Sequence, residues 1–188
     1  MKQTLLTFAL LLATLTAGAQ DIELTPEGAY ERKEVVTVDS VSAAVLYDRA
    51  MMALTDWAGP DGKAKAGIDY QNQETHTVVY KGSFYAGNRK WMTTTIDRYA
   101  NFTLKVRCKD GRAQVTVNVP TLTATVASVG RSQTWNLGEA IAEMEKTSGS
   151  RRERGEEAVA YITDTADNIL ASMKAALAVD GGGGDDDF

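Results

Sequence analysis

Apolar and polar residues alternate along the middle of the chain, which is the pattern of half-buried β-strands. The alternation is clearest over residues 101–108 and 114–119 and is also present near residues 35–38, 68–70 and 77–85. The Asp-Gly pair in Lys109-Asp110-Gly111-Arg112 predicts a hairpin between the two clearest strands. Ala86-Gly87-Asn88 predicts a turn. The apolar phase shifts by one residue at Pro120, which predicts a bulge or a strand end.

Helical spacing of apolar residues appears on both sides of these strands. Residues 43–58 carry apolar side chains every three or four positions, and Asp39, Ser40 or Ser42 could cap their start. In the last third of the chain, Asn136 and Ser150 each stand three residues before a glutamate. This spacing predicts two capping boxes and two helices, the second of them long.

Four short segments accompany the order strand, helix, four strands and helices: Val35-Val36-Thr37-Val38-Asp39, Leu46-Tyr47-Asp48-Arg49-Ala50, Lys81-Gly82-Ser83-Phe84 and the predicted hairpin turn. With this order of elements they resemble a secreted Bacteroidetes domain of unknown function with a TATA-box-binding-protein-like fold. The resemblance covers residues 35–119. The resemblance implies a curved antiparallel sheet with helices packed on one face. The residue patterns predict about five strands and a long C-terminal helix, so the expected fold class is α+β. The resemblance implies no catalytic residues, because fold alone does not define function.

The ends of the chain predict its organisation. Residues 1–19 have the form of a signal peptide: Lys2, a short apolar run and the cleavage motif Ala17-Gly18-Ala19. We therefore expect an exported protein, periplasmic or extracellular, with no transmembrane segment after cleavage. Residues 20–34 are predicted to be a flexible lead-in, residues 35–179 a single α+β domain, and residues 180–188 a disordered Gly/Asp tail.

Composition excludes several functions. The net charge of −5 does not favour a nucleic-acid surface. The one histidine, His76, has polar neighbours and predicts a solvated side chain, and Cys108 lies in phase with apolar residues and predicts a buried thiol. The charged residues 151–157 predict a solvated helical turn. We therefore expect no catalytic residues, no metal and no cofactor.

The remaining prediction is a non-enzymatic periplasmic or surface binding module for a protein or glycan. The alternatives are a hydrolase with an unrecognised site and a structural or assembly domain of an envelope complex. The polar phase of the strands supplies the predicted binding face, namely Lys81, Lys105, Arg107, Gln114 and Asn118. Tyr85, Trp91 and Tyr99 are predicted exposed aromatics, and Ser40, in Asp39-Ser40-Val41, resembles a Bacteroidetes O-glycosylation acceptor.

Overall fold

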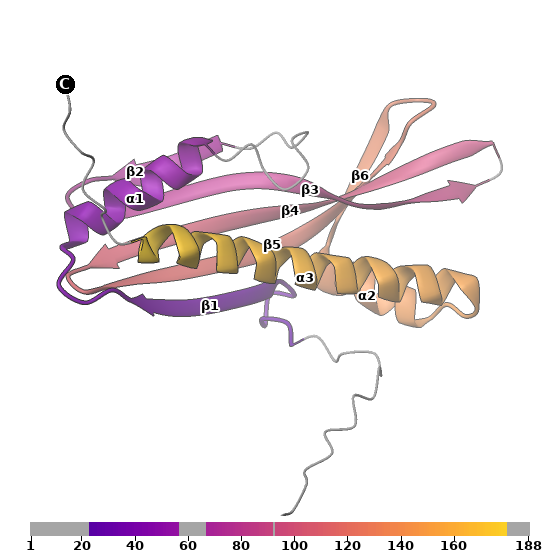
Figure 1. Ribbon diagram of the computed structural model, residues 1–188. Helices are drawn as coiled ribbons and strands as arrows, with labels where there is room; N and C mark the ends of the chain where they lie inside the picture. The colour runs from indigo at the N-terminus through magenta and orange to yellow at the C-terminus, as the bar shows by residue number, and fades with distance from the viewer. Residues whose placement is uncertain (1–22, 57–66, 92, 180–188) are drawn as a thin grey trace, which may run out of the picture.

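The computed structural model describes residues 23–56, 67–91 and 93–179 (Figure 1). The elements in chain order are β1 (Tyr30–Thr37), α1 (Ala43–Asp56), β2 (Gly67–Asn72), β3 (Thr77–Trp91), β4 (Thr94–Lys109), β5 (Arg112–Val126), β6 (Arg131–Asn136), α2 (Leu137–Glu145) and α3 (Ser150–Ala178). The described strands form one antiparallel sheet in the order β1-β5-β4-β3-β2, with β6 also paired to β5. The predicted α+β class is confirmed, with six strands in this part of the chain.

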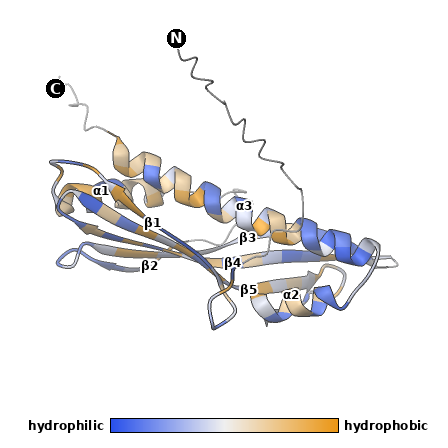
Figure 2. Cartoon of the chain, turned by 90° about the horizontal axis from the view of Figure 1, so that it is seen from below, coloured by the Kyte–Doolittle hydropathy of each residue, from blue (hydrophilic) through white to orange (hydrophobic). Residues whose placement is uncertain are grey.

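One half of the sheet contains the main core. We call it the proximal half: β1, β2, residues 77–85 of β3, 101–109 of β4 and 112–119 of β5. Helices α1 and α3 contact each other and pack on the same face of this half (Figure 2). The fully buried side chains are those of the predicted apolar phase and include Leu46, Val78, Phe84, Phe102, Leu104, Val106, Val115, Val117, Val119, Ile162 and Leu177. The period-two and helical patterns therefore predicted the inward faces correctly.

Strand β5 changes partner at Pro120. Residues 112–119 pair with β1, and residues 121–126 pair with β6. Opposite this point β4 pairs Asn101 with Thr121 and Thr103 with Asn118, so β5 has one residue more than β4 in the interval. The bulge predicted from the phase shift is therefore present. Proline fits here because it has no N–H to donate to a ladder.

The second half of the sheet begins beyond two bulges. We call it the distal half: residues 86–91 of β3, 94–100 of β4, 120–126 of β5, and β6. The turn predicted at residues 86–88 is wrong, because β3 continues to Trp91 through a bulge in which Gly87 has φ 90°. A positive φ is readily adopted by glycine, which explains why the sequence looked like a turn. Strand β6 was not predicted, since residues 131–134 are exposed and polar.

The segment before β1 also belongs to the fold. Strand β1 begins at Tyr30, so the flexible lead-in predicted over residues 20–34 is wrong for the last five of them. Residues 25–28 form a turn that is tied to the start of α2. The Gly28 carbonyl accepts from Gly138 N at 2.9 Å, and Asn136 Nδ2 donates to the Glu27 carbonyl at 2.7 Å.

The helix caps agree with only part of the prediction. Ser42 Oγ accepts from Val45 N at 3.4 Å, and Asp110 of the β4–β5 hairpin accepts from Ala43 N at 2.8 Å. Asn136 caps α2 by accepting from Gly138 N. The capping box at Ser150 is wrong, because α3 is capped by Gly149 and Ser150 Oγ instead accepts from Arg154.

Several predicted features lie outside the described residues. These are the signal peptide, the Gly/Asp tail and the last two residues of the helical pattern predicted over residues 43–58. Within the described residues, no helix combines the length and apolar character needed to cross a membrane.

Candidate functional site

The sheet face turned away from α1 and α3 carries the predicted binding residues. Strand register pairs Lys81 with Thr103, which pairs in turn with Asn118. It also pairs Lys105 with Thr116 and Arg107 with Gln114. Residues of this phase are partly or fully exposed, while their neighbours along each strand are buried. All five predicted residues, Lys81, Lys105, Arg107, Gln114 and Asn118, therefore lie on one face, which we call the polar face.

The five predicted residues of the polar face differ in whether their side chains have an acidic partner. Lys81 Nζ lies 3.0 Å from Asp69 Oδ2, which offsets its charge. Asn118 Nδ2 donates to Glu31 Oε2 at 3.1 Å. Lys105 and Arg107, by contrast, have no carboxylate partner among the residues described. Lys33 of β1 pairs with Thr116 and therefore adds a further positive charge to this face near Lys105.

The polar face continues into the distal half because of the bulge at Pro120. Asn101 Nδ2 donates to Thr121 Oγ1 at 2.9 Å and to Thr123 Oγ1 at 3.0 Å. Two further hydroxyl pairs extend the row, Thr123 with Thr134 at 2.8 Å and Thr125 with Ser132 at 2.9 Å. Sequence analysis missed this row, although threonine at every second position from residue 121 was a visible signal.

The predicted aromatics and the predicted acceptor serine have different positions. Tyr85 and Tyr99 are paired across β3 and β4, partly exposed, with ring centroids 5.7 Å apart in an edge-on arrangement. Trp91 ends β3, and its side chain lies outside the described part. Ser40 is exposed in the turn before α1 with φ 66°, and the capping role belongs to Ser42. Its modification stays a prediction.

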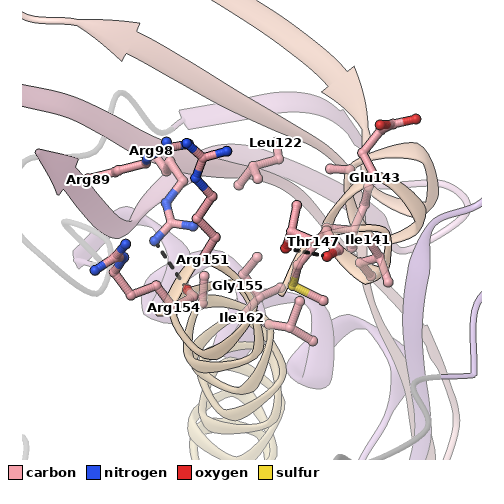
Figure 3. A pocket seen from close by; sticks show the side chains of 15 residues that line it. Arg89, Arg98, Leu122, Ile141, Glu143, Thr147, Arg151, Arg154, Gly155 and Ile162 are labelled. Carbon is pink, nitrogen blue, oxygen red and sulfur yellow. Dashed lines mark hydrogen bonds between the residues drawn. The ribbon is translucent and has the colours of Figure 1, made fainter. Parts of the chain in front are cut away.

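A pocket lies between α2, the first turns of α3 and the distal half (Figure 3). Its volume is about 270 Å³. One side carries the arginine side chains Arg89, Arg98, Arg151 and Arg154, and the rest is mainly apolar, with Leu122, Leu137, Ile141, Met144, Val159 and Ile162. We call it the arginine pocket. Arg151 and Arg154 are exposed, as predicted for that turn, yet they also line this pocket.

The two residues with distinctive chemistry lie elsewhere. The ring of His76 packs edge-on against Tyr47, with centroids 6.0 Å apart. Cys108 is buried, and burial raises the pKa of its thiol from 9.0 to about 11. Among the described residues, no group of three His, Cys, Asp or Glu side chains could hold a metal ion.

Together, the antiparallel sheet, the helices on one face and the long final helix define an α+β protein with a TBP-like fold. Residues 33–122 match the family described as "Domain of unknown function (DUF4468) with TBP-like fold". The chain therefore carries a domain of the DUF4468 family, which confirms the family resemblance.

Two solved structures share the fold. A DUF4468 family protein from Bacteroides ovatus ATCC 8483 is similar with a TM-score of 0.57 and 16% identity, covering 89% of this chain and 95% of that one. A TBP-like protein from Parabacteroides distasonis ATCC 8503 has a TM-score of 0.56 and 12% identity, covering 83% and 96%. Among curated proteins, none matches the chain. At these identities the similarity establishes the fold and no activity.

Proposed function

We propose that this protein is an exported, non-enzymatic binding module whose polar face binds an acidic glycan. The observation that carries the proposal is the register of β3, β4 and β5. It places Lys105 and Arg107 on the same face as the Tyr85–Tyr99 pair and the Asn101 hydroxyl row. Export is supported by the signal-like residues 1–19.

The chemistry of the polar face favours a glycan over a protein. The cores of protein interfaces are depleted in lysine, whereas Lys105 lies on β4, the middle strand of the five-strand order. Hydroxyl and amide groups such as those of Thr121, Thr123 and Asn101 suit the hydroxyl groups of a sugar. Guanidinium and ammonium groups bind carboxylates strongly.

The test is affinity electrophoresis of the protein through polygalacturonate, with dextran as the neutral polysaccharide. We expect retardation by polygalacturonate alone. Replacing Lys81, Lys105 and Arg107 together by Ala should abolish it. The fold should survive, because each surface substitution typically changes stability by no more than about 0.5 kcal/mol.

The matched control replaces Lys146, Arg152 and Lys174 by Ala, which removes the same charge from helix surfaces away from the polar face. This variant should be retarded like the wild type. Equal retardation of both triple variants would refute the polar face as the binding site. If the protein captured an acidic protein and bound neither polysaccharide, the proposal that the ligand is a glycan would be refuted.

A further inference from the structure

The arginine pocket gathers positive charge that the described chain does not neutralise. Arg89 comes from β3, Arg98 from β4, and Arg151 and Arg154 from the first turns of α3; Figure 3 shows Arg89, Arg98 and Arg151 on the same side of the pocket. Across residues 23–56, 67–91 and 93–179, none of the four forms an ion pair. Glu143 also lines the pocket, but it is paired with Lys146 at 2.6 Å. Positive charges held close together repel one another, and a bound anion offsets this repulsion.

Arg98 is the strongest single indication. Its Nε is buried and has no hydrogen-bond acceptor within the described chain, while its Nη2 lies 3.5 Å from the Arg154 carbonyl. Burial lowers the pKa of Arg98; Tyr85 and Glu157 oppose this effect, and Arg154 and Arg89 add to it. A buried charged donor without an acceptor is rare in folded proteins. The described chain therefore leaves the charge of Arg98 uncompensated, and an anion bound in the pocket would compensate it.

The start of α3 adds to the positive potential. The N-cap residue is Gly149, which has no side chain to accept from the first N–H groups of the helix. The N-terminus of a long helix attracts anions through these groups and through the helix dipole. Figure 2 shows that these first turns are hydrophilic, whereas later turns of the helix are largely apolar.

The remainder of the pocket is apolar. Leu122 comes from the sheet, Ile141 and Met144 come from α2, and Ile162 comes from α3. Gly155 allows the two helices to approach closely, since a Cβ at that position would overlap the Met144 side chain. A volume of about 270 Å³ is just below the usual range of small-molecule sites, about 300–1,000 Å³, so a bound molecule must be small.

We propose that the arginine pocket binds a small amphipathic anion, a carboxylate or phosphate group with a short apolar tail. The arginine side chains and the start of α3 hold the head group, and the side chains of Leu122, Ile141, Met144 and Ile162 cover the tail. The site lies on the opposite side of the sheet from the polar face and is independent of glycan binding.

The test is isothermal titration calorimetry with octanoate, octyl phosphate, inorganic phosphate and 1-octanol. We expect saturable binding of octanoate or octyl phosphate, weakened by salt. Tighter binding of octanoate identifies a carboxylate as the preferred head group, and tighter binding of octyl phosphate identifies a phosphate. Inorganic phosphate and 1-octanol should each bind at least about tenfold more weakly. Inorganic phosphate lacks the apolar tail, and 1-octanol lacks the anionic head group.

Three substitutions locate the binding site. Arg98→Gln and Arg151→Gln should each weaken binding at least about tenfold. Arg151 is exposed, so its replacement tests the pocket even if the Arg98 variant folds poorly. The matched control is Arg152→Gln, one residue further along α3, whose guanidinium is paired with Glu156 and does not line the pocket. The proposal would be overturned if none of the probes bound. It would also be overturned if the Arg151 and Arg152 variants lost the same amount of affinity for octanoate or octyl phosphate.

Discussion

The proximal and distal halves of the sheet share three strands, β3, β4 and β5, yet they differ in how their side chains are packed. In the proximal half the apolar side chains of one phase of β3, β4 and β5 are buried under α1 and α3. In the distal half residues 94–99 of β4 and 120–126 of β5 are all only partly buried, on both faces. The difference shows that the same strands can supply a core at one end and accessible binding surfaces at the other.

The bulges explain how one strand serves both halves. Without the extra residue at Pro120, the side chains of Thr121, Thr123 and Thr125 would point towards the helices, and Leu122 would point to solvent. With it, the threonine residues stay on the polar face and Leu122 lines the arginine pocket. The two candidate binding surfaces therefore depend on the same local irregularity.

The largest expected contrast between the halves is in core stability. Leu104→Ala, in the proximal half, should lower the free energy of unfolding by about 3–4 kcal/mol, because the side chain is fully buried. Leu122→Ala, the matched change in the distal half, should lower it by about 1 kcal/mol, because that side chain is only partly buried. Urea denaturation measures both values. Equal losses would mean that the distal half is packed as tightly as the proximal half.

Thiol reactivity should show a second contrast. With its pKa raised to about 11, Cys108 holds about a hundredfold less thiolate near neutral pH than an ordinary thiol of pKa 9.0. Iodoacetamide should therefore label it slowly in the native state and rapidly in urea. A cysteine introduced as Ala124→Cys, in a Cys108→Ala background, should react almost as fast in the native state as in urea, since position 124 is partly exposed. Similar labelling rates at positions 108 and 124 in the native state would show that the two halves do not differ in thiol reactivity.

The same thiol predicts the direction of a pH effect. The native state holds the Cys108 proton more tightly than the unfolded state, because the native pKa lies above the ordinary value. Its contribution to stability is therefore complete below pH 9 and is lost as the pH rises from 9 towards 11. A Cys108→Ala variant should lack this loss in alkaline denaturation curves.

The smallest expected effect concerns the distal helices. In a Met144→Ala background, Gly155→Ala should stabilise the protein by up to about 1 kcal/mol, since alanine favours a helix interior over glycine. In the wild-type background the new methyl group meets Met144 and the gain should disappear. A double-mutant cycle in urea measures this coupling. Independent, additive effects would show that Met144 does not pack on α3 at Gly155.

Much of the fold could be predicted because side-chain periodicity is local. Alternation at residues 101–108 and 114–119 marked the buried faces of β4 and β5. The helical spacing of residues 158–177 marked the buried side of α3. A residue that faces a core must be apolar wherever its partners lie, so these patterns can be recognised before the partners are known.

What only the tertiary structure decided is which distant residues meet. Arg89 and Arg98 are more than fifty positions from Arg151, and no local pattern relates them; they share a pocket because α3 begins over the distal half. Strand β6 and the turn at residues 25–28 have too few apolar residues to show periodicity, and they are held by backbone hydrogen bonds to β5 and α2. Backbone pairing does not depend on side-chain type, so no side-chain pattern predicts it. The sequence by itself therefore determined the buried faces, and the tertiary structure alone formed the surfaces where we propose that ligands bind.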